Sequence, residues 1–244
     1  MVKIKRTPTA PASLAVEKAK GTANYRSEDV IRQLHQDFHG KCYLCEIDEL
    51  QSIQVEHLKA HHNGQNRDLM FDWNNLFYSC AHCNNVKNTK QYEDSILDCC
   101  QVEPEAYIQQ ELINSHVRVA ALDDSHTARM TAKLITECFE KTNTGIRTLE
   151  CKTRVDALQK TMAVLYRNLE LYQKEPTART LRVLRGMLNR SYKFAGFTRT
   201  YVRQHIDEYP ELAPFVKILQ IKPFTISQTG GSATEPPAAW RDKG

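Results

Sequence analysis

The sequence predicts an α+β protein that is mostly α-helical, with a small stranded module ahead of a helical domain. The segment SIQVEHL at residues 52–58 is rich in β-branched side chains, which are typical of a strand. After residue 98, apolar side chains recur at helical spacing instead. Two Cys-x-x-Cys pairs enclose the predicted strand, so we expect it to belong to a separate, stapled unit that precedes the helices.

Composition divides the chain into four parts. The first residues are basic, contain Pro8 and Pro11, and show little apolar periodicity. Ser27 is a suitable N-cap for a helix over residues 28–38. The residues from Ser227 onward are low in complexity and are expected not to fold. The expected parts are a basic N-terminal arm (1–24), the stranded module (25–100), the helical domain (101–224) and a disordered tail (225–244).

The bulk composition is that of a globular intracellular protein. Of the 244 residues, 41% are hydrophobic and 25% are charged. No apolar run reaches the roughly 18 residues that a membrane span needs, and the N-terminus lacks the apolar segment of a secretory signal. We therefore expect a cytoplasmic protein, in which paired cysteines serve as metal ligands rather than disulfides.

Five helices are expected after residue 98. The first contains Leu112 and Ile113, and the fourth begins near Pro176. The third, over residues 146–172, has the clearest pattern, because its apolar residues alternate steps of four and three along one face. That face consists of Leu158, Met162, Leu165, Leu169 and Tyr172. The second helix contains Leu134, Ile135, Cys138 and Phe139, and the fifth follows Thr198 through Tyr201 and Ile206.

The two cysteine pairs predict a structural zinc site. Cys42 and Cys45 form the first pair, and Cys80 and Cys83 form the second. Each Cys-x-x-Cys turn places two thiolates on one side of a tight knuckle, and two knuckles complete a tetrahedral shell that suits Zn²⁺. Four thiolates leave no open position for water, so this zinc is expected to staple the module rather than to catalyse. A rival ligand set replaces one cysteine with His61 or His62.

The segments between and after the two knuckles contain polar residues that a simple zinc ribbon does not need. Glu56-His57 ends the predicted strand, Asn75-Leu76 precedes the second knuckle, and Asn84 follows it. With CYLC upstream and a lysine downstream, this order resembles the HNH nuclease motif, the ββα-metal finger, over about residues 40–90. The resemblance implies an endonuclease that hydrolyses nucleic-acid phosphodiester bonds with the help of a metal ion.

The resemblance also implies a role for each motif residue. His57 is the general base that activates water, and Asn75 pins the loop that carries it. Glu56 and Asn84 ligate a catalytic Mg²⁺ or Mn²⁺, for which carboxylate and amide oxygens are suited. Asn88 lies one helical turn beyond Asn84 and is an alternative ligand. The amides left open for this role are Asn84, Asn85 and Asn88.

Basic side chains that could contact nucleic acid occur in two places. Lys87 and Lys90 follow the second knuckle, and Arg182 and Arg185 lie in the fourth expected helix. Residues 145–205 hold 13 Lys or Arg against 4 Asp or Glu. Such an excess indicates a polyanion or an acidic partner, although solvated helix faces would produce the same count.

A narrower resemblance rests on three segments: YRSEDVIRQLHQDFHGKCYLCE, VEHLKAH and FDWNNLFYSCAHCNNVKNTK. They are similar to the HNH effectors of Septu-type antiphage systems, including those attached to retrons. This implies a nuclease held in check by an ATPase of the ABC/SMC type, and in some systems by a reverse transcriptase with its RNA–DNA hybrid. The alternatives are a non-catalytic zinc module that binds nucleic acid or protein, and an adaptor whose helices carry the function.

Overall fold

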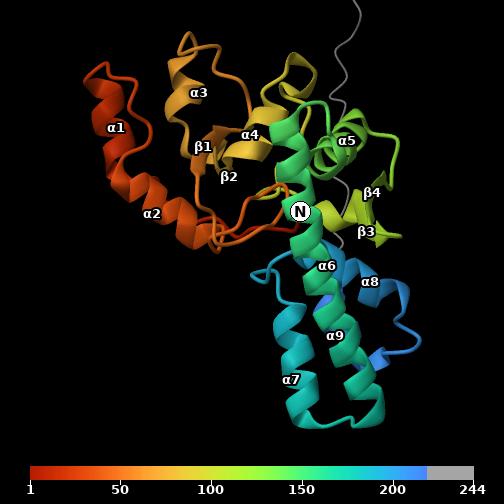
Figure 1. The fold of residues 1–244 in the computed structure, drawn as a ribbon. Coiled ribbons are helices and arrows are strands. Elements are labelled where there is room, and N and C mark those ends of the chain that lie inside the picture. Colours follow the sequence, from red (N-terminus) through yellow and green to blue (C-terminus); the bar gives the residue numbers. More distant parts are fainter. Residues whose placement is uncertain (219–244) are drawn as a thin grey trace, which may run out of the picture.

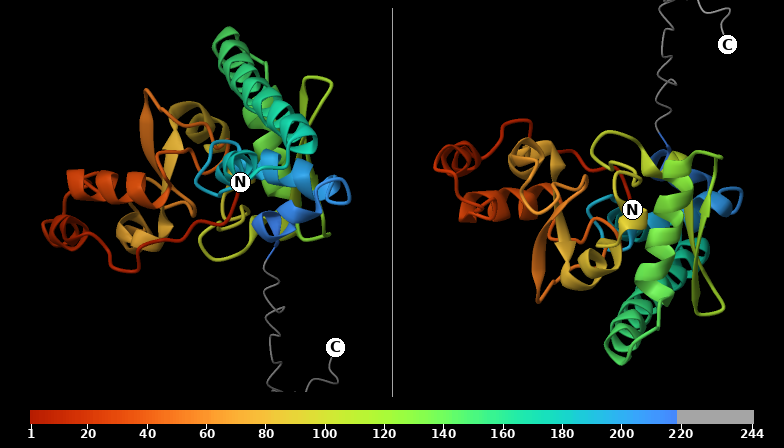
Figure 2. Two further views of the ribbon diagram at one scale, coloured as in Figure 1. Left: turned by 90° about the horizontal axis from the view of Figure 1, so that it is seen from below. Right: turned by 90° about the horizontal axis from the view of Figure 1, so that it is seen from above.

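The computed structural model describes residues 1–218 and has the α+β architecture that the sequence predicts (Figure 1). The tail expected at residues 225–244 lies outside this range. Helices α1 and α2 lie on one side of the strand pair β1–β2, and the larger helices lie on the other side (Figures 1 and 2). The elements are α1 (Ala12–Ala19), α2 (Glu28–Asp37), β1 (Ile53–His57), α3 (Arg67–Phe71), β2 (Leu76–Cys80), α4 (Ala81–Lys87), β3 (Ile108–Ile113), β4 (His116–Ala121), α5 (His126–Glu140), α6 (Gly145–Lys174), α7 (Ala178–Met187), α8 (Ala195–Gln204) and α9 (Ala213–Val216).

Strands β1 and β2 form an antiparallel pair that leads directly into α4. Val55 lies opposite Tyr78, and His57 lies opposite Leu76 at the end of the ladder. All five residues of β2 are buried, because α2 and α4 both pack against this strand. Its sequence, LFYSC, suits that position, since a strand covered on both faces needs a nearly continuous apolar run. The strand expected over residues 52–58 is therefore confirmed.

The first residues belong to the core, and the irregular arm expected over residues 1–24 is only partly correct: residues 1–11 form no helix or strand, but α1 follows them. Met1 and Ile4 are buried, and α1 is regular helix. The Arg6 guanidinium lies 4.7 Å from the centroid of the Trp73 ring and donates a hydrogen bond to the Leu76 carbonyl. A basic side chain can enter the interior when an aromatic face and backbone oxygens receive its charge. The basic composition of this segment therefore did not mean that it is exposed.

A β-hairpin stands where the first helix after residue 98 was expected. Strands β3 and β4 pair antiparallel, with Leu112 opposite Val117. Asn114 and Ser115 have φ angles of +48° and +69°, the left-handed conformation that a tight two-residue hairpin turn requires. The helix predicted through Leu112 and Ile113 is wrong, because two adjacent apolar residues define no period and the Asn-Ser turn is a weak signal.

The other expected helices are present, with shifted ends. Helix α7 begins at Ala178 behind the N-cap Thr177, two residues after Pro176. Helix α8 begins at Ala195, ahead of Thr198. Helix α6 extends over residues 145–174, and its expected apolar face is buried against α5, α7 and α8. The buried residues of that face are Leu158, Met162, Leu165, Leu169 and Tyr172.

The two halves of the chain share one core, in which apolar residues from both are packed together. Three hydrogen bonds add to this packing. The Lys41 ammonium, in the first knuckle, donates to the carbonyl oxygens of Arg190 and Tyr192 at 2.7 Å. The Phe194 amide donates to the Glu46 carbonyl at 3.2 Å. Among the described residues, no helix is both long and apolar enough to cross a membrane.

Candidate functional site

Four buried cysteines form a cluster at the base of the strand pair. The sulfur atoms of Cys42, Cys45, Cys80 and Cys83 all lie within 4.8 Å of one another. Sulfur atoms around a tetrahedral zinc ion lie about 3.8 Å apart, given a Zn–S bond of about 2.3 Å, and the sulfurs of Cys45 and Cys80 are 4.0 Å apart. The cluster could therefore hold a zinc ion through four thiolates.

Local structure brings the second pair into position. Cys80 is both the last residue of β2 and the N-cap of α4, and its sulfur accepts a hydrogen bond from the Cys83 amide at 3.4 Å. The first pair lies in the loop after α2, which is held by the Tyr43 amide donating to the Tyr78 carbonyl at 3.0 Å. Neither His61 nor His62 belongs to the cluster, so the rival ligand set finds no support.

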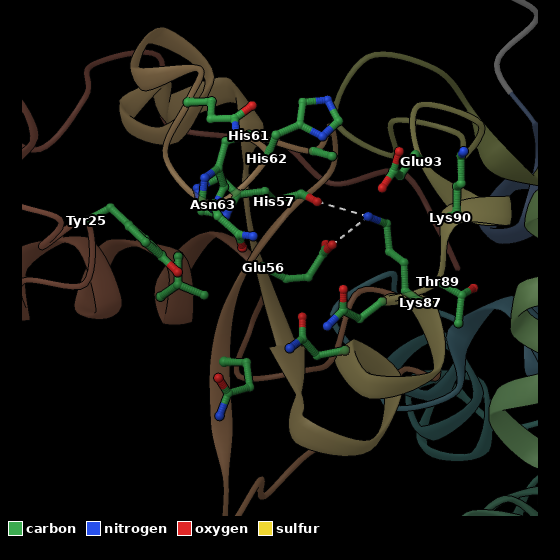
Figure 3. Close-up of a pocket in the computed structure, with 16 residues that line it drawn as sticks. Tyr25, Glu56, His57, His61, His62, Asn63, Lys87, Thr89, Lys90 and Glu93 are labelled. Carbon is green, nitrogen blue, oxygen red and sulfur yellow. Dashed lines mark hydrogen bonds and ion pairs between the residues drawn. The ribbon is translucent and has the colours of Figure 1, made fainter.

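A polar cavity of about 650 Å³ opens above the sheet at the end of β1 (Figure 3). We call it the His57 cavity. Its walls are the end of β1, the loop over residues 60–65, and the C-terminal part of α4 with the residues that follow it. The motif residues that line it are Glu56, His57, Asn84, Lys87, Asn88 and Lys90. Of the predicted catalytic residues, candidate ligands of the catalytic ion and lysines of the motif, only Asn75 and Asn85 do not line this cavity.

His57 is half-buried at the end of β1, and its ring is fixed on several sides. Its Nε2 atom lies 3.1 Å from the Met70 carbonyl oxygen, so Nε2 carries the proton and donates it. The ring centroids of Tyr25 and His61 lie 4.5 Å and 4.3 Å from that of His57. Burial lowers the pKa of His57 to about 4. At neutral pH the ring is therefore neutral, with the Nδ1 lone pair free to accept a proton.

Glu56 is buried and already has two partners. The Lys87 ammonium lies 2.6 Å from one carboxylate oxygen, and the Tyr43 hydroxyl donates to the other at 2.7 Å. Burial raises the pKa of Glu56, and these two partners oppose the rise. A hard cation would have to share the Glu56 oxygens with these groups or displace one of them.

Lys87 is placed differently from the phosphate contact that the motif implied. Its side chain is only 8% exposed. The ammonium donates to the carbonyl oxygens of His57 at 2.9 Å and Leu58 at 3.1 Å, in addition to its ion pair with Glu56. All three of its donor positions are used inside the protein. Lys87 therefore ties α4 to the end of β1, while Lys90, which is exposed, reaches the cavity edge (Figure 3).

Asn75 lies behind the cavity and holds the loop that follows His57. Its side-chain oxygen accepts from the Lys59 amide at 2.7 Å. Its side-chain nitrogen donates to the carbonyls of Lys59 at 3.0 Å and Leu69 at 2.9 Å. The side chain is buried and makes no contact with the cavity. The geometry is that of the pinning residue expected from the motif.

The amides expected to hold a catalytic ion lie along α4 and just after it. Asn84 is half-buried and Asn88 exposed, and both line the cavity, whereas Asn85 does not. Glu93, which the sequence did not single out, also lines it (Figure 3). Within residues 1–218, the four cysteines are the only group of three or more His, Cys, Asp or Glu placed to share an ion.

The sequence did not identify two residues that contact His57, and two of the arginines it singled out lie away from the cavity. Tyr25, which precedes the motif, and Met70, which lies within its span, both contact His57, and no spacing in the sequence signals either of them. Arg182 and Arg185 are exposed on α7, which points away from β1 and α4 (Figure 1), and neither lines the His57 cavity. No protein-family model matches the chain, and no curated protein matches it either.

Proposed function

We propose that the chain is a metal-dependent HNH-type endonuclease and that the His57 cavity is its active site. One observation carries the proposal: a neutral histidine, its Nε2 bound to the Met70 carbonyl, lines a polar cavity that a carboxylate, Glu56, and an amide, Asn84, also line. The Nδ1 nitrogen of such a histidine suits a general base that takes a proton from an attacking water. The order β1–β2–α4, with a cysteine cluster at its base, is consistent with the ββα-metal finger.

The cavity contains the types of donor that a hard divalent ion prefers. Glu56 would supply a carboxylate oxygen once Lys87 or Tyr43 gives way to the ion, and Asn84 or Asn88 would supply an amide oxygen. Such an ion, when bound, would neutralise charge on the phosphate and the leaving oxygen. The chain itself would orient His57 through Met70, hold the neighbouring loop through Asn75, and attract the substrate with Lys90.

The wider role we propose is that of a toxic effector in an antiphage system, controlled by a partner ATPase and in some systems by a retron. This wider role rests only on the resemblance of three sequence segments to Septu-type effectors. The second candidate function is a non-catalytic zinc module that binds nucleic acid or protein. The Glu56–Lys87 pair favours it, because the proposed metal ligand already has a cation beside it.

The deciding experiment compares His57→Ala with His126→Ala. His126 is an exposed histidine at the start of α5, outside the cavity. Nuclease activity of the pure chain with Mg²⁺ or Mn²⁺, and toxicity in cells that also express the adjoining genes, are both measured. We expect His57→Ala to retain zinc and fold while losing activity by about 10²- to 10⁴-fold, and His126→Ala to resemble wild type. Full toxicity of a folded His57→Ala protein would contradict the nuclease proposal and favour the non-catalytic binding module.

A further inference from the structure

Arg154 lies in the first half of α6 and reaches the cysteine cluster. Its side chain is only 5% exposed. One terminal nitrogen, Nη2, donates to the Cys80 sulfur at 3.1 Å. The other, Nη1, donates to the Glu150 carbonyl at 2.7 Å and to the Glu150 carboxylate at 2.6 Å. Nε has no hydrogen-bond partner within the part of the chain that the structure describes.

Glu150 alone does not account for the burial of this guanidinium. A buried charge is costly unless a partner of opposite charge is buried with it. The Glu150 side chain is 45% exposed, so solvent screens its carboxylate and weakens the pair. The acceptor that lies fully inside with Arg154 is the sulfur of Cys80. A neutral thiol accepts hydrogen bonds weakly, whereas a thiolate is a full anion.

The charge of a cluster that holds zinc accounts for the burial of the Arg154 guanidinium. Four thiolates and one Zn²⁺ carry a formal charge of −2 in a site where each cysteine is buried. The metal-free cluster with protonated thiols carries none. A guanidinium in contact with one sulfur therefore stabilises the zinc-bound cluster more than the metal-free cluster. Groups that hydrogen-bond to metal ligands commonly raise metal affinity in this way.

We propose that Arg154 is an outer-shell cation of the zinc centre, which strengthens zinc retention and attaches α6 to the second knuckle. The side chain comes from a helix about 70 residues after the second knuckle and outside the motif that predicted the centre. The helical region thereby contributes directly to the stability of the metal site. The proposal does not depend on nuclease activity.

The test measures how fast the full chain transfers zinc to a chromogenic chelator at neutral pH. Arg154→Gln is compared with Arg167→Gln, which removes an exposed arginine from the same helix. We expect Arg154→Gln to weaken retention and speed zinc loss by roughly 10- to 100-fold. Arg167→Gln is expected to match wild type. Folding of each protein is checked by circular dichroism before the chelator is added.

Two further variants keep the test decisive if Arg154→Gln does not fold. Arg154→Met replaces the guanidinium with an apolar chain and is expected to lose zinc as fast as Arg154→Gln. Arg154→Lys keeps the charge, but a single ammonium cannot span Cys80 and Glu150, so we expect an intermediate rate. Zinc loss at the wild-type rate in any folded Gln or Met variant overturns the proposal. So does a wild-type rate in Arg154→Lys where that is the only variant that folds.

Discussion

At the scale of single residues, the orientation of the His57 ring is the most strongly constrained feature of the cavity. The Met70 carbonyl fixes the position of Nε2. Tyr25 and His61 pack edge-on against the ring at interplanar angles of 71° and 61°. The backbone amide of Gly64 in turn donates to His61 Nδ1 at 2.8 Å, which holds that second ring in place. A ring held in this way can present only one nitrogen to the cavity.

The first prediction concerns Tyr25, which supports His57 from outside the motif. Tyr25→Leu removes the aromatic edge, while Tyr25→Phe keeps it. If His57 is the general base of the proposed nuclease, the Leu variant should lose up to about tenfold in cleavage at unchanged KM, because an aromatic pair contributes about 0.5–1.5 kcal/mol. The Phe variant should match wild type. Nitrogen chemical shifts of His57 provide an independent measurement. An unchanged tautomer population in Tyr25→Leu would show that Tyr25 does not orient the ring.

The second prediction concerns the buried Glu56–Lys87 pair. Lys87→Met leaves the Glu56 carboxylate without its cation, so we expect the free energy of unfolding to fall by about 3–5 kcal/mol. Lys90→Met removes an exposed lysine nearby and is expected to change it by less than about 0.5 kcal/mol. Adding Glu56→Gln to Lys87→Met should recover much of the loss. Denaturant unfolding of wild type, Lys87→Met, Glu56→Gln and the double variant measures this cycle, and strictly additive effects would contradict a direct pair.

The residue types at the site were predictable, but their partners were not. The resemblance to the HNH motif singled out Glu56, His57 and Asn84, and all three line the cavity. Lys87 points inward because α4 places the Lys87 ammonium against the end of β1. Contacts of that kind join segments 30 residues apart, and no local pattern encodes them.

At the scale of elements, predictability followed the strength of the periodic signal. Helix α6 carries a long apolar face, and its extent was predicted to within two residues at each end. The β3–β4 hairpin was missed, because its strands alternate only partially and part of β4 is exposed. Its position is set by α5 and α8, which pack on it, and such tertiary support cannot be read from one short segment.

The third prediction contrasts two helical glycines. A Cβ added at Gly196, in α8, would lie 1.8 Å from the Gln110 side-chain nitrogen and 2.8 Å from a Glu46 carboxylate oxygen. The Gly196 amide also donates to that carboxylate at 2.8 Å. We therefore expect Gly196→Ala to destabilise the protein by about 1–3 kcal/mol through overpacking.

Gly186, in α7, has open space around its added Cβ. Gly186→Ala should therefore stabilise the protein by about 0.5–1 kcal/mol, because alanine is the better helix former. Thermal or denaturant unfolding of both variants gives the comparison. Equal effects at the two glycines would mean that the close approach of α8 to β3 and Glu46 is not maintained in solution.

At the scale of the whole molecule, the cysteine cluster lies between the two halves of the chain. The sequence suggested a finger and a separate helical domain, but both contribute to the surroundings of the cluster. His82, in α4, bonds through Nε2 to the Cys138 carbonyl of α5 at 3.0 Å. Arg154 of α6 contacts Cys80 directly. Helices from the second half therefore pack against the base of the strand pair in the first.

The fourth prediction follows from this arrangement. A chelator that removes zinc from a loaded cluster would leave four buried sulfurs without a common ion, next to contacts made by α5 and α6. If the halves were independent, only the signals of the strand pair would change, and the helical circular dichroism would persist. We expect instead that zinc loss lowers the unfolding temperature of the helices together with that of the strand pair, in one transition. The measurement follows zinc release, far-ultraviolet circular dichroism and the amide resonances of α6 and β2 in the same sample. Helices that retain their full stability after complete zinc release would show that the shared core, rather than the metal, holds the two halves together.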